Sequence, residues 1–364
     1  SGMFGVTGTA SRLFSAIAHA GINIILITQG SSEASISFSV APSHSAKAKK
    51  VVEKEFEYEI ERGVINKVKV EDDLSVVAII GENMRYQPGI SGRLFQALGN
   101  NGINVVAIAQ GSSELNISVV IPKSDEIKAL NAMHEAFFLS DLKSLHIFMV
   151  GVGLIGGTLI RQIKEHAEYL KKEQNIEVKV VGLSNSKKML LDWQGINLEN
   201  WKAALDASDK KADLAQYVEE MVVDMNMSNS IFIDNTADEG ITNFYEKILD
   251  SSISISTPNK IATSSAYLQY QRLKNIAEKR GVKFMYETNV GAGLPIITTL
   301  NDLNMSGDRI LKIEGVLSGS LSFIFNNFDG SRKFSDIVTE AKELGYTEPD
   351  PREDLSGFDV RRKI

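Results

Sequence analysis

The 364-residue sequence contains no cysteine, which excludes disulfide bonds, thiolate metal sites and a cysteine nucleophile and is typical of a reducing compartment. It has no hydrophobic run long enough to span a bilayer and no signal-like charged region ahead of an apolar stretch. It also lacks a lysine- or arginine-rich block, and its formal net charge is -7, so the clustered basic surface that nucleic acids attract is missing. We therefore expect neither nucleic acid nor a membrane as a partner.

The length and composition are those of a globular chain with two or three domains, since 43% of the residues are hydrophobic and 23% are charged. The opening residues, SGMFGVTGTASRLFSAI, are typical of a strand end that leads into a helix, and the segment ending at Ile364 is still helical in pattern. We therefore expect both ends to be cut from a longer protein. The predicted location is cytoplasmic, and a plastid stays open because the natural N-terminus is expected to be absent.

Two segments of the first third repeat at an offset of 81 positions. They are RLFSAIAHAGINIILITQGSSEASISFSV from Arg12 and RLFQALGNNGINVVAIAQGSSELNISVVI from Arg93. Each predicts a helix that ends at a glycine, then a β-branched strand, a polar turn, a second strand and a second helix, over 45–62 or 125–138. Residues 74–80 supply a leading strand to the second copy only. The order is βαββα, a small α/β sandwich with its helices on one sheet face.

The turn QGSSE recurs unchanged between the copies while its neighbours differ, which indicates a shared role beyond that of an ordinary hairpin turn. The two copies resemble paired ACT domains, regulatory modules that bind amino acids. The resemblance implies that Asn23 and Gln29, with Asn104 and Gln110 in the second copy, hydrogen-bond an effector. A buried amide offers both a donor and an acceptor to the polar ends of an amino acid.

A short apolar strand at 145–150 leads directly into a glycine-rich turn and a helical pattern, which predicts a Rossmann-type dinucleotide site. The turn is Gly151-Val-Gly153-Leu154-Ile155-Gly156. The first glycine makes the tight turn, the second lets the backbone approach the pyrophosphate, and the third lets the helix pack on the strand. The phosphates would face the N-terminus of that helix.

The next strand, at 177–188, ends in Ser184, Asn185, Ser186 and Lys187 rather than in an acid. An acid at this place would repel a 2′-phosphate, so its absence favours NADP, with NAD as the alternative. An ordinary solvated loop is the other interpretation.

Two further parallel strands, within 230–238 and 252–264, end in polar loops at the edge where doubly wound sheets bind ligands. This places Thr236 and the tripeptide Pro258-Asn259-Lys260 beside the nicotinamide. Lys260 could instead be a surface charge, but a lysine that follows a buried strand and a proline is expected to point into the crevice.

The turn YETNVGAGLPII carries Glu287 and exposes several carbonyls, an oxygen cage suited to a monovalent cation, or simply the first turn of a helix with Pro295 near its start. Residues 313–328 then predict a strand that passes through Ser318-Gly319-Ser320. Near the C-terminus, GYTEPDPREDLSGFDVRRK predicts a helix with Gly357 inside it. Asp359 and Lys363 lie four apart on one face of that helix; an exposed pair of this kind contributes only about 0.3–0.5 kcal/mol.

The run AKELGYTEPDPREDLSGFDVRRK resembles the homoserine dehydrogenase signature, as do TPNK, ETNVGAGLP and GVLSGSLSFI. With two ACT copies in front of it, the chain resembles the middle of a bifunctional aspartokinase/homoserine dehydrogenase of the threonine-sensitive type. The resemblance implies a kinase domain upstream and the rest of the dehydrogenase downstream. We expect four domains: a truncated ACT domain at 1–70, a second at 71–141, a Rossmann domain at 142–285 and the start of an α+β catalytic domain at 286–364.

The resemblance implies reversible hydride transfer between NAD(P)H and L-aspartate 4-semialdehyde, giving L-homoserine. Lys363 would shuttle the proton, and Lys260 would polarise the carbonyl. Glu348 and Asp359 would hold the substrate ammonium, and Asp354 would help to arrange them.

The resemblance also implies a sodium-like ion that orders the turn, held by Glu287 and the carbonyls of Val290, Ala292 and Leu294. Threonine would be the effector, the parent protein would also phosphorylate L-aspartate with ATP, and the assembly would be a homodimer or homotetramer.

Two rival functions stay open. An ACT-regulated dehydrogenase of another hydroxy acid would carry a late catalytic histidine, whereas His19, His44, His134, His146 and His166 all lie in the ACT region or beside the first Rossmann strand and helix. A non-catalytic amino-acid sensor that keeps a nucleotide-binding domain is the second rival.

Overall fold

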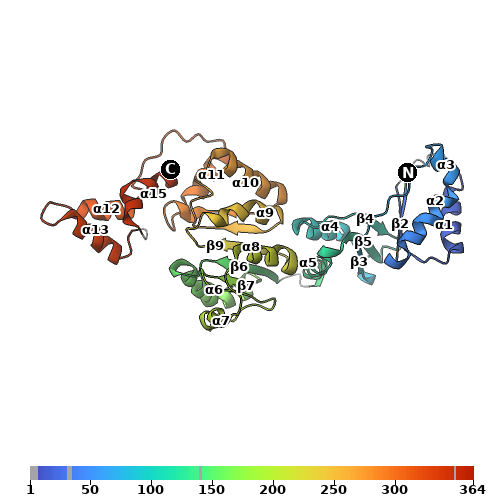
Figure 1. Ribbon diagram of the computed structural model, residues 1–364, viewed down its shortest axis with the longest axis horizontal. Helices are drawn as coiled ribbons and strands as arrows, with labels where there is room; N and C mark the ends of the chain where they lie inside the picture. Colours follow the sequence, from blue (N-terminus) through green and yellow to red (C-terminus); the bar gives the residue numbers. More distant parts are fainter. Residues whose placement is uncertain (1–6, 31–34, 139–141, 348–349) are drawn as a thin grey trace. The chain divides into compact units, whose positions relative to one another are not determined.

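The computed structural model describes residues 7–30, 35–138, 142–347 and 350–364. The chain forms two compact units, residues 1–140 and 141–364, and each is described by itself (Figure 1). Within the described residues, no helix combines the length and the hydrophobicity needed to cross a membrane.

The first copy of the repeat consists of α1 (Thr9–His19), β1 (Ile24–Gln29), β2 (Ile36–Val40), α2 (Ser45–Glu55) and α3 (Glu57–Glu61). Strands β1 and β2 pair antiparallel. Leu13 and Ile17, one helical turn apart on α1, pack with Val52 of α2 in one buried cluster. The single helix predicted over 45–62 is divided at Phe56, so α2 and α3 are separate.

The second copy consists of β3 (Leu74–Ile80), α4 (Ile90–Asn100), β4 (Ala107–Gln110), β5 (Asn116–Pro122) and α5 (Glu126–Phe138). Its three strands form an antiparallel sheet in the order β3-β5-β4. Leu94 and Leu98 of α4 are fully buried against this sheet. The predicted glycine ends of both first helices are confirmed, because Gly21 and Gly102 follow them with φ of 68° and 69°.

The second unit is built on a six-stranded sheet in the order β11-β10-β9-β6-β7-β8. The strands are β6 (Lys143–Val150), β7 (Ile176–Ser184), β8 (Met189–Leu191), β9 (Ser230–Asp234), β10 (Ser254–Ser256) and β11 (Phe284–Met285). All neighbours pair parallel except β8, which is an antiparallel edge. The chain order reverses around β6, and doubly wound sheets bind their ligands at the carboxyl ends of the strands beside such a point. The predicted Rossmann-type sheet is confirmed.

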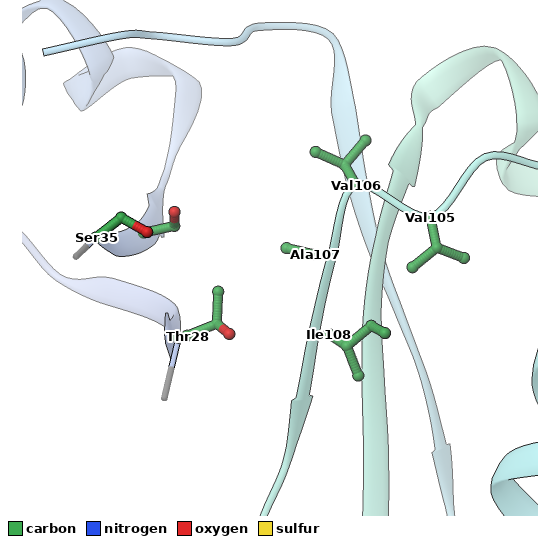
Figure 2. Close-up of a pocket in the computed structure, with 8 residues that line it drawn as sticks. Thr28, Ser35, Val105, Val106, Ala107 and Ile108 are labelled. Carbon is green, nitrogen blue, oxygen red and sulfur yellow. The ribbon is translucent and has the colours of Figure 1, made fainter. Parts of the chain in front are cut away.

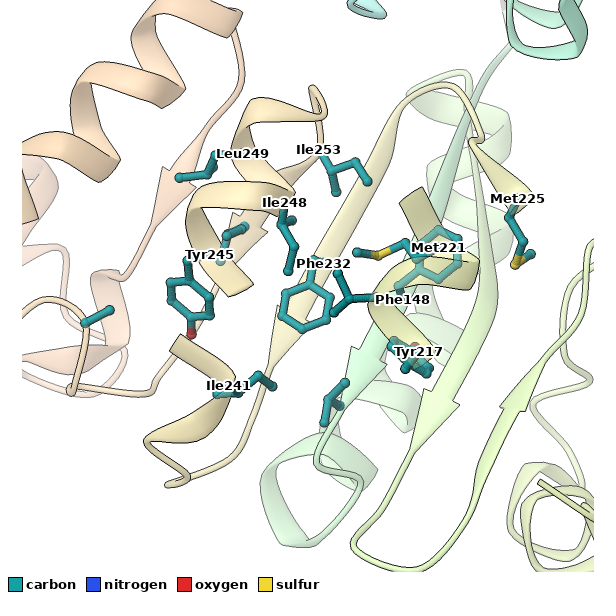
Figure 3. Packing of buried hydrophobic residues seen from close by; sticks show 14 of the residues in the cluster. Phe148, Tyr217, Met221, Met225, Phe232, Ile241, Tyr245, Ile248, Leu249 and Ile253 are labelled. Carbon is teal, nitrogen blue, oxygen red and sulfur yellow. The ribbon is translucent and has the colours of Figure 1, made fainter. Parts of the chain in front are cut away.

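Helices cover both faces of this sheet (Figure 1). They are α6 (Leu154–Glu173), α7 (Trp201–Ala207), α8 (Leu214–Glu219), a π-helical turn η4 (Glu220–Met225), α9 (Tyr245–Asp250) and α10 (Tyr267–Arg280). Alternate residues of β6 enter different cores: Ile147 and Met149 pack with α6 and α7, while Phe148 packs on the opposite face. Figure 3 shows Phe148 beside Tyr217. The two rings pack edge to face, with their centroids 6.5 Å apart.

The C-terminal part carries α11 (Ile296–Met305), α12 (Gly319–Asn327), α13 (Phe334–Glu343), α14 (Pro351–Leu355) and α15 (Phe358–Lys363). Single 3₁₀ turns occur at η1 (Pro42–His44), η2 (Glu82–Met84), η3 (Lys123–Asp125), η5 (Gly240–Phe244) and η6 (Glu287–Asn289).

Two sequence predictions about this part are wrong. No strand forms between α11 and α12, where Ile313 and Val316 are 67% and 83% exposed. A strand needs a neighbour for its backbone groups, and the described residues place none beside this segment. The helix predicted to run through Gly357 is instead two helices, because Gly357 has a left-handed φ of 74° and separates α14 from α15.

Gly182 of β7 provides a test of the core packing. A Cβ atom there would lie 2.5 Å from Tyr217 Oη and 2.8 Å from Phe148 Cδ1, both fully buried. We expect Gly182→Ala to lower the free energy of unfolding by about 1–3 kcal/mol, because the core must shift to make room.

The matched control is Gly157→Ala on α6, where a Cβ would meet its nearest neighbour at an ordinary 3.9 Å. This change should be neutral or stabilise by up to about 1 kcal/mol. Urea unfolding of the two variants measures the difference; equal losses would contradict the packing described here.

Candidate active site

The glycine-rich turn after β6 is crowded where its first and third glycines lie. A Cβ on Gly151 would lie 2.8 Å from the carbonyl carbon of Asn235, and one on Gly156 would lie 2.1 Å from the carbonyl oxygen of Gly151. Gly153, by contrast, has open space where its Cβ would be. The turn therefore allows a close approach only at Gly153, where the first turn of α6 presents its unpaired N–H groups.

A spare hydrogen-bond donor lies beside this turn. The Nδ2 atom of Asn235 is buried and, among the described residues, has no hydrogen-bond partner. It would lie 3.2 Å from a Cβ on Gly156. A buried donor without a partner is costly, so its place fits a ligand that brings an acceptor. The crowded turn and this donor together fit a dinucleotide.

The loop after β7 is a closed turn without an acid. Asn185 Oδ1 accepts hydrogen bonds from the backbone N–H groups of Lys187 and Lys188, both at 2.7 Å. Ser184 is buried and its carbonyl accepts from Gly151 N at 2.9 Å, which ties the two loops together. Ser186 and Lys187 are exposed. The loop predicted to face the ribose phosphate therefore carries no acidic side chain of its own.

The loops after β9 and β10 converge on one buried carboxylate that sequence reasoning missed. Asp234 ends β9 and accepts from Thr236 N at 2.7 Å and from Asn259 Nδ2 at 3.0 Å. Burial raises the pKa of Asp234, and the hydrogen bonds it accepts, led by that from Tyr245, lower it only in part. The signal in the sequence is an acid that ends an apolar strand, SIFID, two residues before Thr236.

Two lysines share one carboxylate at the same edge. Asp359 Oδ1 lies 3.0 Å from Lys260 Nζ, and Asp359 Oδ2 lies 2.6 Å from Lys363 Nζ. The side chains of Lys260, Asp359 and Lys363 are only 21%, 8% and 17% exposed. Lys363 also donates to the carbonyl of Leu317 at 2.9 Å. An exposed surface pair, the alternative for Asp359 and Lys363, is therefore wrong.

Among the described residues, two ammonium groups face the one carboxylate of Asp359. Burial alone would raise the pKa of Asp359, but the hydrogen bonds from Lys363 and Lys260 hold it below its ordinary value. Ammonium groups held in place at a sheet edge can stabilise an oxygen on which negative charge develops. Because both oxygens of Asp359 face lysines, the geometry favours Asp359 as the group that positions the two amines.

A second buried acid supports this cluster. Asp354 of α14 is 3% exposed and accepts from Ser320 Oγ at 2.5 Å, and Ser320 Oγ lies 3.0 Å from Ser318 Oγ. Ser318 also caps α12 by accepting from Leu321 N. Sequence reasoning treated the two serines only as part of a strand. Glu348, the other acid predicted to bind substrate, lies outside the described residues.

Glu287 begins the turn predicted to hold a cation. Its carboxylate accepts from the backbone N–H groups of Ile297 and Thr298, at 2.8 Å each, and from Thr298 Oγ1. The Thr298 hydroxyl, with these backbone donors, lowers the pKa of Glu287 although burial opposes it. The carbonyl of Leu294 accepts from Ile296 N. Glu287 therefore acts as a cap of α11, the alternative that the sequence left open, and the cation stays a prediction.

The four amides predicted to bind an effector are exposed in this chain, and their binding role stays a prediction. Each lies at a strand end or in the loop before a strand, where no second layer covers it. Gln110 Oε1 accepts from Ser91 Oγ at 3.4 Å, which links the end of β4 to the start of α4.

A cavity of about 370 Å³ lies between the two copies. Figure 2 shows Thr28 and Ser35 of the first copy facing β4 of the second. Hydroxyl and apolar side chains line the cavity: Thr28, Gly30, Ser35, Ser37, Val105, Val106, Ala107 and Ile108. Gln29 and Gln110 do not line the cavity, although Gln29 lies between Thr28 and Gly30 in the sequence.

Comparisons with known proteins match three parts of the chain to known families. The ACT domain family matches residues 1–56 and 77–137, the NAD binding domain of homoserine dehydrogenase matches 151–287, and the homoserine dehydrogenase family matches 295–364. Over 364 residues the chain is 44% identical to the chloroplastic bifunctional aspartokinase/homoserine dehydrogenase 2 of Arabidopsis thaliana, covering 100% of this chain and 40% of that protein. The chain therefore carries ACT domains followed by the NAD binding domain and part of the catalytic domain of a homoserine dehydrogenase.

A bacterial relative and a solved structure are similar to the chain as well. The bifunctional aspartokinase/homoserine dehydrogenase of Haemophilus influenzae is 44% identical over 363 residues, which is 100% of this chain and 44% of that protein. The chain thus spans less than half the length of its bifunctional relatives. A hyperthermophilic archaeal homoserine dehydrogenase in complex with NADPH superposes with a TM-score of 0.51 at 25% identity, over 60% of this chain and 67% of that one.

The ion pairs of Asp359 with Lys260 and Lys363 predict that the free energy of unfolding depends on pH. The folded-state pKa of Asp359 is below its ordinary value of about 3.9, so its ionised form stabilises the fold above that pH, and the effect is lost as the pH falls through the folded pKa. We expect Asp359→Asn to lower the free energy of unfolding by about 3 kcal/mol at neutral pH, and by much less at about pH 3.

Urea unfolding at the two pH values measures this. Asp302→Asn, on the exposed surface of α11, is the control and should change little at either pH. A loss for Asp359→Asn that does not depend on pH would contradict the ion pairs.

Proposed function

We propose that the protein catalyses the reversible, NADP(H)-dependent interconversion of L-aspartate 4-semialdehyde and L-homoserine, with NAD as an alternative cofactor. The family matches support a homoserine dehydrogenase with a nicotinamide cofactor. The observation that carries the proposal is the cluster of Lys260, Asp359 and Lys363 at the carboxyl edge of the Rossmann sheet. The acid-free loop after β7 supports NADP over NAD.

In this proposal the two lysines act on the same substrate oxygen. The cofactor, when bound, supplies or accepts the hydride at the neighbouring carbon. Lys260 polarises the carbonyl of the semialdehyde, and Lys363 donates a proton to the oxygen during reduction and takes it back during oxidation. Asp359 holds both amines in place. Asp354, fixed by Ser320, orders the start of the C-terminal helices, and Glu348 and Asp359 bind the substrate ammonium.

The cofactor-binding residues are proposed as the sequence predicted them. The turn formed by Gly151, Gly153, Leu154, Ile155 and Gly156 would hold the pyrophosphate. The loop of Ser184, Asn185 and Ser186 would hold the ribose phosphate. Thr236, Pro258, Asn259 and Lys260 would surround the nicotinamide. A sodium-like ion held by Glu287 and the carbonyls of Val290, Ala292 and Leu294 would have a structural role.

Regulation and assembly follow from the ACT region. Threonine would bind through Asn23, Gln29, Asn104 and Gln110, and the parent protein, which would also phosphorylate aspartate, would assemble as a dimer or tetramer. The relatives include chloroplastic proteins from plants and a bacterial protein, so both predicted compartments are represented among them.

Lys363→Ala tests the chemistry. We expect it to abolish the formation of reduced nicotinamide from homoserine and NADP, while the Kd for NADPH stays within about twofold, because the amine acts on the substrate oxygen. The control is Lys342→Ala on α13, an exposed lysine, which should keep full activity.

The assay follows the near-ultraviolet absorbance of the reduced nicotinamide. No change with the unaltered protein would refute the proposed activity and favour a non-catalytic sensor. Equal losses of turnover and cofactor affinity in Lys363→Ala would make this lysine structural.

Gln110→Ala tests the effector site. We expect weaker inhibition by threonine with an unchanged uninhibited rate, because the amide would contact the effector and not the substrate. Gln96→Ala removes another exposed amide of the same copy and should leave the inhibition curve unaltered. An inhibition constant for Gln110→Ala equal to that of the unaltered protein would count against this role.

A further inference from the structure

Asp234 is a buried acid with a set of donors around it. Its side chain is 0% exposed at the end of β9. It accepts from Tyr245 Oη at 2.6 Å and Asn259 Nδ2 at 3.0 Å on one oxygen, and from Thr236 N at 2.7 Å on the other. All three partners donate, so the site is suited to an ionised carboxylate, which only accepts.

Two of these donors belong to loops that leave the sheet beside the proposed nicotinamide site. Thr236 lies in the loop after β9, and Asn259 lies in the loop after β10. The same loops are also joined through the backbone: Thr257 Oγ1 donates to the carbonyl of Asp234 at 2.8 Å, and Asn259 Nδ2 also donates to the carbonyl of Asp238 at 3.0 Å. One carboxylate thus sets the spacing of two neighbouring strand ends.

The loop held in this way carries Lys260. Asn259 Oδ1 accepts from Ile261 N at 3.0 Å, so the Asn259 side chain spans the lysine from one side to the other. Lys260 then extends to Asp359, 3.0 Å away. A change in the position of Asn259 would therefore move the start of the lysine side chain relative to Asp359.

A role in stability alone explains this arrangement poorly. Taking a carboxylate out of water is unfavourable, and a well-packed apolar side chain at the same place would avoid that cost. Tyr245 is already anchored by packing, because its ring meets those of Phe232 and Phe284 edge to face. The acid is needed for the two polar loops.

We propose that Asp234 is a positioning residue, which holds the Thr236 loop and the Asn259–Lys260 loop at the spacing that nicotinamide binding and hydride transfer require. This inference rests on the proposed function.

Asp234→Asn in the full-length protein is the test. An amide of the same shape must turn its NH₂ group toward either Thr236 N or Asn259 Nδ2, so one loop loses its acceptor. We expect the Kd for NADPH to rise and kcat to fall by at least about tenfold each. Tyr217→Phe is the matched control: it removes a buried tyrosine hydroxyl that donates to the carbonyl of Met149 and to neither loop, so kcat and Kd should stay within about twofold.

A rescue variant separates positioning from folding. Asp234→Asn combined with Asn259→Asp reverses the pair, so that the introduced amide can donate to the introduced acid, and we expect it to recover at least about tenfold of the kcat lost. If Asp234→Asn does not fold, the double variant is compared with the unaltered protein. A folded double variant more than about a hundredfold slower contradicts the inference.

Other outcomes are equally decisive. If Asp234→Asn melts at a lower temperature but keeps the kcat and NADPH Kd of the unaltered protein, Asp234 is only structural and the inference is refuted. The same holds if Tyr217→Phe loses as much activity as Asp234→Asn. The proposed function fails separately, when the unaltered protein binds NADPH but does not oxidise homoserine.

Discussion

The attraction between the Asp359 carboxylate and two lysine amines is the interaction on which the site depends. Lys260 comes from the loop after β10, and Lys363 comes from α15 at the other end of the dehydrogenase region. The acid between them offsets the repulsion between the two like charges. The bond from Lys363 to the carbonyl of Leu317 fixes α15 against the segment that leads into α12. The site is therefore made by two parts of the chain that meet through charge.

Buried acids recur around this cluster, each with donors from the protein. Asp234 orders the loops on the Rossmann side, and Asp354 is bonded to Ser320 on the side of the C-terminal helices. In both cases the carboxylate accepts hydrogen bonds that hold loops or helix starts together. The substrate and cofactor would then meet a surface whose polar groups are already oriented, which is what electrostatic stabilisation of a developing charge requires.

The sequence predicted the features that depend on residues close to one another along the chain. The glycine turn at 151–156, the repeat of helix and strands, and the parallel strands were all predictable, because each depends on neighbours along the chain. Features that depend on residues far apart in the sequence were not predicted. The absence of a strand at 313–317 depends on the lack of a neighbouring strand among the described residues, and the break at Gly357 was missed because a glycine after a short helical run fits both a helix and a left-handed turn. Asp234 was missed because its donors come from three separate segments.

The most direct test of the account is a crystal structure of the full-length protein with reduced cofactor and homoserine. The account predicts that the amines of Lys260 and Lys363 both lie within hydrogen-bond distance of Asp359 and of the homoserine side-chain oxygen, next to the nicotinamide ring. A Lys363 amine that faces bulk solvent, away from the ring and from Asp359, would contradict it.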